Sequence, residues 1–140
     1  MKILVAVDGS SYTKRMLAYL VAHDEWLGGA HAYTALTVTP LVPPRAAAVL
    51  DREVLRGYYH DEAEKVFKPI RQFFDKQGVK ATYVAKTGQA ADAIVALADK
   101  GKFDLVIMGS HGHGAVINLV MGSVVTKVVA QCRVPILLIR

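Results

Sequence analysis

Closely spaced glycines stand near the C-terminus of the chain, in Gly109-Ser110-His111-Gly112-His113-Gly114 and again in Gly122-Ser123. The first run follows an apolar stretch typical of a buried strand, and the second precedes an apolar helical pattern that starts at Val124. Glycines leave backbone N–H groups accessible because no Cβ covers them, and a helix N-terminus carries partial positive charge. These residues therefore predict an anion site of the kind that holds phosphate groups.

Two common phosphate-binding motifs do not account for these glycines. A Walker-type loop is excluded, because neither Gly-Lys-Ser nor Gly-Lys-Thr occurs anywhere in the chain. The dinucleotide-binding fingerprint fits poorly, because Ile117 stands where its third glycine belongs and the run follows the fourth expected strand rather than the first. The spacing that is present is Gly109-x2-Gly112-x9-Gly122-Ser123.

The other residues that could bind a ligand or react are weaker indications of function. His111 and His113 lack a third ligand-type neighbour at metal spacing, which disfavours a zinc site. Asp8 follows the first apolar run, where it either contacts a ligand or accepts backbone N–H bonds within its own turn. Cys132 falls on the apolar stripe of the last helix, which favours a buried, inert thiol over a reactive one.

Composition limits the possible classes of protein. The 140 residues fit one domain, residues 1–140, and 53% of them are hydrophobic, far more than a disordered chain carries. No apolar run has the roughly 18 residues that a membrane helix needs, and Asp8 interrupts the first apolar run too early for a secretion signal. The net charge is +5, but the basic residues form no cluster of the kind that binds nucleic acid. A single cysteine favours a reducing, cytoplasmic location.

Strand and helix patterns alternate along the whole chain. Strands are expected at residues 2–7, 31–39, 79–86, 103–108 and 134–139. Helices are expected after the turn at residues 8–11 up to near Gly28-Gly29, in a long segment ending at Gly78, at Ala90–Lys100 and at Gly122–Gln131. Pro40–Ala48 is expected to be extended and stiff, and Pro69 to kink the long helix. This alternation predicts an α/β fold, a parallel open sheet with helices on both faces. Ligands of such sheets bind at the carboxyl ends of the strands.

The glycine spacing, together with motifs at both ends of the chain, resembles the ATP-binding branch of the universal stress protein family. The opening Ile3-Leu4-Val5-Ala6-Val7-Asp8-Gly9-Ser10 is similar to the first strand and turn of that family. Residues 104–112 are similar to its fourth strand and loop, and Gly122-Ser123-Val124 with residues 134–139 to its last helix and strand. The resemblance spans the chain and implies a single Rossmann-like domain with five strands in the order 3-2-1-4-5.

The resemblance also implies an adenine-nucleotide site for ATP, with Mg²⁺ as its companion. Gly109, Gly112, Gly122 and Ser123 match the motif that holds the ribose and phosphates, and Val124 continues it. By position in the fold, Asp8 is expected to lie beside the nucleoside or a bound magnesium ion. The backbone of Val38 is expected to contact the edge of the adenine ring. Family members often carry Arg or Lys where this chain has His113, and an imidazole supplies less charge to phosphates, so weaker or pH-dependent affinity is expected.

The sequence allows three functions, of which it favours the first. The first is an ATP-binding stress-response module, and the second is a dimeric interaction protein of the same fold that binds no nucleotide. The third is a slow ATPase, for which the sequence offers no clear base or cationic cluster. The apolar last strand, residues 134–139, would lie at a sheet edge, where pairing with a second copy would satisfy its backbone groups. A homodimer through this strand is therefore expected, and the resemblance implies it as well.

Overall fold

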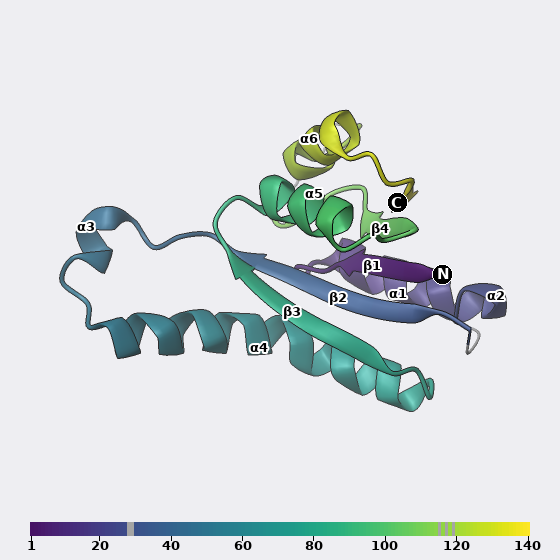
Figure 1. The fold of residues 1–140 in the computed structure, drawn as a ribbon, viewed down its shortest axis with the longest axis horizontal. Helices are drawn as coiled ribbons and strands as arrows, with labels where there is room; N and C mark the ends of the chain where they lie inside the picture. The colour runs from purple at the N-terminus through teal and green to yellow at the C-terminus, as the bar shows by residue number, and fades with distance from the viewer. Residues whose placement is uncertain (28–29, 115, 117, 119) are drawn as a thin grey trace.

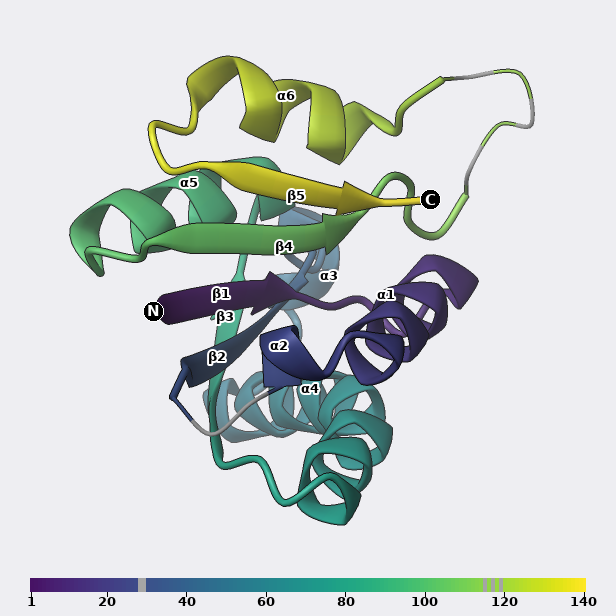
Figure 2. The same ribbon diagram turned by 90° about the vertical axis from the view of Figure 1, so that its right-hand side faces the viewer.

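The chain folds into a five-stranded parallel sheet with strand order β3-β2-β1-β4-β5, which confirms the fold expected from the sequence (Figure 1 and Figure 2). The structure is a computed structural model, and it describes residues 1–27, 30–114, 116, 118 and 120–140. β1 lies between β2 and β4, and Ala6 near the end of β1 stands opposite Met108 in β4. The turns that follow these two strands are therefore neighbours at one edge of the sheet.

The strands begin or end one or two residues away from the expected positions. They are β1 (Lys2–Ala6), β2 (Ala32–Thr39), β3 (Ala81–Thr87), β4 (Leu105–Gly109) and β5 (Ile136–Ile139). The helices are α1 (Ser11–Ala22), α2 (Asp24–Leu27), α3 (Pro44–Ala47), α4 (Arg52–Lys76), α5 (Ala90–Lys100) and α6 (Ser123–Gln131). α4 is one continuous helix that contains Pro69, the residue at which the sequence predicts a kink.

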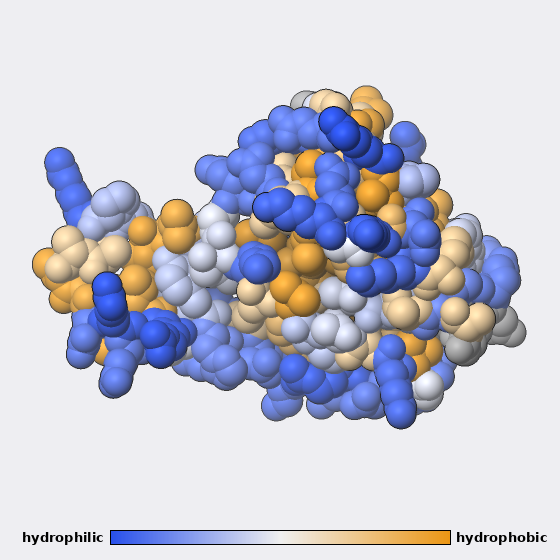
Figure 3. All heavy atoms as spheres, in the orientation of Figure 1, coloured by the Kyte–Doolittle hydropathy of each residue, from blue (hydrophilic) through white to orange (hydrophobic). Residues whose placement is uncertain are grey.

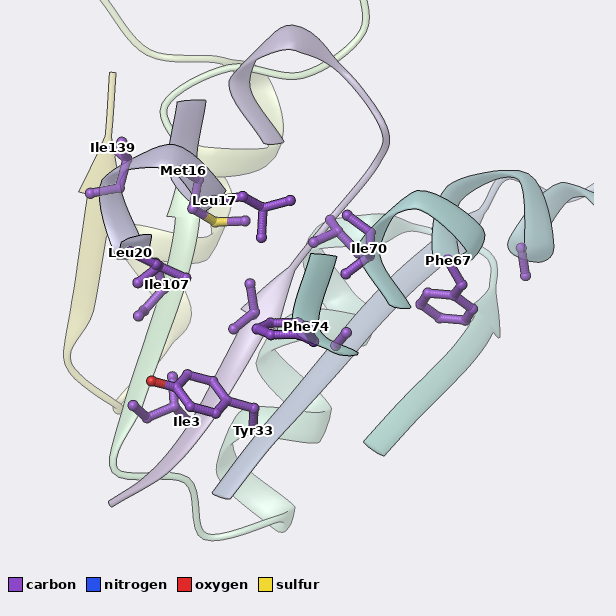
Figure 4. Close-up of a cluster of buried hydrophobic side chains, with 14 residues drawn as sticks. Ile3, Met16, Leu17, Leu20, Tyr33, Phe67, Ile70, Phe74, Ile107 and Ile139 are labelled. Atoms are coloured by element: carbon purple, nitrogen blue, oxygen red, sulfur yellow. The ribbon is translucent and has the colours of Figure 1, made fainter. Parts of the chain in front are cut away.

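Helices cover both faces of the sheet, and each face has its own core. Figure 2 shows α1 and α4 on one side and α5 and α6 on the other. Alternate residues of β1 point to opposite faces, so Ile3 packs with α1 and α4 while Leu4 packs with α5 and α6. Figure 4 shows the first core, in which Phe74 is fully buried. Among the apolar residues of α1 and α6, Val21, Val124 and Val129 are exposed rather than part of either core.

Two segments differ from the sequence expectation. The first helix ends at Ala22, with His23 as its C-cap, rather than near Gly28-Gly29, a pair that lies outside the described residues. The His23 ring bonds to the Tyr19 carbonyl at 2.8 Å and stacks on the Tyr19 ring, which stabilises this break. The Pro40–Ala48 segment is not extended throughout, because it contains α3, a short helix with Pro44 in its first turn, where the missing N–H is tolerated.

The segment from Leu41 to the first turns of α4 forms an arm that reaches away from the sheet. Figure 3 shows apolar side chains gathered over α3 and this arm. Leu41, Val49 and Val54 are 65%, 84% and 56% exposed, and the arm is tied to α4 where the Val42 N–H donates to the Tyr59 hydroxyl at 2.9 Å. Within the part of the chain that the structure describes, no helix is long and apolar enough to cross a membrane.

Tyr33 places a hydroxyl group inside the first core. Its side chain is 3% exposed, and among the described residues its oxygen is the buried side-chain polar atom without a hydrogen-bond partner. Burial raises the pKa of Tyr33 to about 12. Burying a polar group without a partner costs roughly 1–3 kcal/mol.

Tyr33→Phe is therefore expected to increase the free energy of unfolding by about 1 kcal/mol, because it removes the buried hydroxyl and keeps the ring. Urea unfolding followed by circular dichroism measures this change. Tyr59→Phe serves as the control, since it removes a hydroxyl that does accept a hydrogen bond and should lower stability. A loss of stability in Tyr33→Phe equal to that in the control would contradict the prediction.

Candidate functional site

A cleft lies at the carboxyl ends of β1, β2 and β4. Its volume is about 840 Å³, within the range of roughly 300–1,000 Å³ that small-molecule pockets span. The eight residues that the sequence analysis placed at a ligand all line this cleft: Asp8, Val38, Gly109, Gly112, His113, Gly122, Ser123 and Val124. In Figure 2 the arrows of β1 and β4 point toward the same side, where the chain leads on into α6.

The turn after β1 is a compact network around Asp8. Gly9 follows Asp8 with a φ of 77°, a backbone conformation that glycine adopts without strain. The Asp8 Oδ1 atom accepts hydrogen bonds from the Ser10 N–H and the Thr13 hydroxyl, both at 2.9 Å. Ser10 caps α1 in turn, because its side chain accepts from the Thr13 N–H. One carboxylate oxygen is thus fully engaged within the turn.

The loop after β4 is closed at its base and packs against α1. The Ser110 N–H donates to Ile139 O at 2.8 Å, and the Gly122 N–H donates to Ser110 O at 2.9 Å. Gly109 lies so close to α1 that an added Cβ would be 2.7 Å from Tyr12 Cβ. These contacts fix the start of α6 next to the end of β4.

The loop is fastened to the β1 turn at a second place. The Asp8 Oδ2 atom accepts the His113 N–H at 3.3 Å, and the His113 Nε2 atom lies 2.7 Å from the Asp8 carbonyl oxygen. A Cβ on Gly112 would come within 2.5 Å of Asp8 Oδ2, so a side chain at this position would displace the Asp8 carboxylate. The glycine spacing predicts open amides after β4, but the structure shows that the amides of Ser110, His113 and Gly122 have partners within the protein.

The N-terminus of α6 is a part of this surface that stays open to an anion. Gly122 is its N-cap residue and brings no side chain that could accept from the first-turn N–H groups. Ser123 and Val124 both line the cleft, and Ser123 adds a hydroxyl there. α6 has nine residues, and its dipole gives the N-terminus partial positive charge. The cleft can therefore hold an anionic group at this end.

Comparison with known proteins identifies the family. The model of the universal stress protein family matches residues 1–140 of this chain. The chain belongs to the universal stress protein family. A universal stress protein of Thermus aquaticus is 34% identical over 99% of this chain and 97% of its own length.

Solved structures show the same fold at lower identity. The structure of MJ0577 has a TM-score of 0.82 and 24% identity, covering 99% of this chain and 94% of its own. A universal stress protein family protein from Arabidopsis thaliana, solved with AMP bound, has a TM-score of 0.71 and 18% identity, covering 99% and 90%. The universal stress protein from Archaeoglobus fulgidus, solved with dAMP, has a TM-score of 0.65 and 21% identity, covering 100% and 98%.

In this universal stress protein the cleft is also lined by α4 and α5, which lie on opposite faces of the sheet and were not expected there from the sequence. Glu62, Lys65 and Val66 contribute from α4, and Ala90 and Ile94 from α5. Lys65 Nζ and Glu62 Oε1 form an ion pair at 2.6 Å. The helical pattern identified the core-facing side of each helix, but which turn of α4 lies at the cleft depends on how α4 packs on β2 and β3.

His111 also lines the cleft, although the sequence suggested for it only the role of a possible metal ligand. Its Nδ1 atom lies 3.0 Å from Ser110 Oγ, and its ring packs against Tyr12 at a centroid distance of 4.9 Å. It lines the cleft from the same loop as His113. Within the described residues, no three His, Cys, Asp or Glu side chains gather closely enough to hold a metal ion.

The surroundings of Asp8 favour its charged form. Burial raises the pKa of its carboxyl, but the hydrogen bonds from Ser10 and Thr13 and the charge of His113 outweigh that effect and hold the pKa below its ordinary value of 3.8. The stability that this carboxylate contributes is fully present above the pKa of the unfolded chain. It is lost as the pH falls through the lower pKa of the folded protein.

Asp8→Asn is expected to lower the free energy of unfolding by roughly 1–2 kcal/mol at neutral pH, because Asn carries an N–H₂ group that cannot replace both acceptor oxygens. The difference from the parent protein should shrink below about pH 4, where the parent loses its charged hydrogen bonds. Urea unfolding of both proteins at pH 7, 5 and 3 measures it. A gap of constant size across these three pH values would contradict the assignment.

Proposed function

We propose that this chain is a regulatory module of the stress response that binds adenine nucleotides, ATP in particular, in the cleft. The observation that carries the proposal is the uncapped N-terminus of α6, which faces a cleft of nucleotide size. Backbone N–H groups at such a position suit phosphate groups. The relatives solved with AMP and dAMP support an adenine nucleotide over other anions.

The proposed ligand runs from α6 to the end of β2. Its phosphates lie at Ser123 and Val124, beside the glycine loop, and its ribose lies near Asp8. β2 pairs with β1 only as far as Leu36 and continues to Thr39, so the backbone around Val38 extends past the end of β1 along the wall of the cleft. This stretch of backbone is where we place the edge of the adenine ring.

We propose that Mg²⁺ accompanies ATP on its phosphates rather than on protein ligands. Asp8 is the acidic residue nearest the glycine loop, and its oxygens already accept three hydrogen bonds. Among the described residues no acidic cluster offers Mg²⁺ the several oxygen ligands that it prefers. The residues present therefore fit a nucleotide better than a protein-held metal ion.

We propose slow hydrolysis or none. Rapid phosphoryl transfer needs a residue that orients water and cationic groups that stabilise the leaving phosphate. The charged side chains that line the cleft from α4, Glu62 and Lys65, are paired with each other. His113 bonds to the β1 turn rather than extending toward α6.

Isothermal titration of the purified protein with ATP, AMP and GTP tests the proposal. We expect saturable binding of ATP with 1:1 stoichiometry per chain, weaker binding of AMP, which carries fewer phosphates, and little binding of GTP. A flat titration with both adenine nucleotides at millimolar concentration would overturn the proposal and favour an interaction protein that binds no nucleotide.

We also propose that residues 1–140 act as one domain that forms a homodimer through β5. β5 stands at the edge of the sheet and pairs with β4, which leaves its other side available for a strand of a second copy. Sedimentation equilibrium is expected to give twice the mass of one chain at micromolar concentration. A monomer that persists to high concentration would contradict this assembly.

A further inference from the structure

We propose that His113 is a positioning residue that fastens the glycine loop to the β1 turn, rather than a ligand for the phosphates. This inference rests on the proposed function, because it assigns a role in the nucleotide site. It also departs from the expectation that the residue at this position supplies charge to the nucleotide.

His113 contacts Asp8 through two hydrogen bonds. The His113 N–H donates to the Asp8 carboxylate at 3.3 Å, and the ring of His113 reaches back to the Asp8 carbonyl oxygen at 2.7 Å. A carbonyl oxygen only accepts hydrogen bonds, so the His113 Nε2 atom must carry a proton and donate it. One residue of the loop thus holds one residue of the turn through both its backbone and its side chain. We call this pair of bonds the Asp8–His113 clasp.

The backbone on both sides is adapted to the clasp. Gly9 directly follows Asp8 with a φ of 77°, and Gly114 directly follows His113 with a φ of 75°. The backbone therefore changes direction immediately after the contact in both the turn and the loop. Residues with a side chain adopt this conformation only with strain. Gly112 lies so close to the Asp8 carboxylate that a Cβ would be 2.5 Å from Oδ2. Three glycines therefore permit the clasp, which argues against a chance surface contact.

The clasp also reaches the phosphate end of the cleft. Gly122, the N-cap of α6, lies against the loop, with its added Cβ 3.3 Å from the His111 Cα atom and 3.9 Å from the Gly112 nitrogen. Holding Gly112 and His113 against Asp8 therefore holds the surface on which the first turn of α6 rests. A loop that is already fixed in its binding conformation loses less entropy when a ligand binds, and this raises affinity.

The test compares two variants with the parent protein. His113→Ala removes the ring, whereas the side-chain amide of His113→Gln can donate to the same carbonyl without carrying charge. We expect His113→Ala to weaken the binding of adenosine, AMP and ATP by a similar factor of about 5–10, in line with the loss of one neutral hydrogen bond. His113→Gln should restore affinity to within about threefold of the parent. His23→Ala is the matched control, because His23 also bonds to a carbonyl, that of Tyr19, outside the cleft.

Selective weakening of ATP, with adenosine unaffected in both variants, would overturn the proposal and make His113 a phosphate ligand. Unchanged or tighter binding in His113→Ala would overturn it as well. Amide hydrogen exchange of the unliganded protein tests the clasp without any nucleotide. The backbone N–H of residue 113 should exchange at least tenfold faster in His113→Ala than in the parent protein. In His113→Gln it should exchange at nearly the parent rate. If the parent binds no nucleotide, the proposed function fails, while this exchange result still decides whether the clasp exists.

Discussion

Gly109→Ala is expected to lower the free energy of unfolding by about 3 kcal/mol, the upper part of the range for inserting a methyl group into a packed site. The new Cβ would lie 2.7 Å from Tyr12 Cβ and 3.3 Å from its backbone carbonyl carbon. Both atoms are close to the backbone of α1, so no flexible side chain can move aside to make room. The end of β4 and the first turn of α1 would have to separate.

Thermal and urea unfolding measure this loss. Gly57→Ala is the matched control, because an added Cβ at Gly57 in α4 meets nothing within 4 Å. Alanine has the higher helix propensity, so this control should gain about 0.5–1 kcal/mol. If the two variants changed stability by the same amount, the close contact between β4 and α1 would be wrong.

Gly112→Ala is expected to weaken ATP binding by about 100-fold, because its Cβ would overlap Asp8 Oδ2. The carboxylate would have to leave the His113 N–H, which removes a charged hydrogen bond worth roughly 1.5–3 kcal/mol and releases the loop beside α6. Isothermal titration with ATP measures the loss, and circular dichroism should show an intact fold.

A double-mutant cycle tests the cause of this effect. In an Asp8→Ala background the clash is absent, so adding Gly112→Ala should cost little further affinity. The two changes would then be strongly non-additive, as expected for residues in direct contact. Additive losses would show that Gly112 acts through something other than Asp8.

The sheet could be predicted from the sequence because β1, β4 and β5 are nearly continuous apolar runs and all five strands are separated by helical patterns. Residues at the carboxyl ends of parallel strands necessarily share one edge of the sheet, and this rule by itself places Asp8, Val38 and Gly109 together. Glu62 and Lys65 could not be found in the same way. They reach the cleft only because of the way in which α4 packs across β2 and β3.

The sequence also could not predict that several amides of the loop donate hydrogen bonds within the protein. Glycine spacing shows where backbone N–H groups are accessible, but not whether another part of the protein binds them first. Here the Asp8 carboxylate takes the His113 N–H, and the Ser110 carbonyl takes that of Gly122. These amides are therefore not available to an anion, whereas the first turn of α6, at Ser123 and Val124, has no side-chain cap.

The central claim is that backbone N–H groups at the start of α6 bind the phosphates, and Ser123→Pro tests it most directly. Proline suits the first position of a helix and has no N–H, and Gly122 already has the extended backbone, with a ψ of 161°, that a residue before proline needs. Ser123→Ala is the control that removes the hydroxyl and keeps the amide. By isothermal titration, Ser123→Pro should bind ATP about 10–100-fold more weakly than Ser123→Ala while adenosine affinity stays unchanged. Equal ATP affinity in the two variants, with α6 intact by circular dichroism, would contradict the claim.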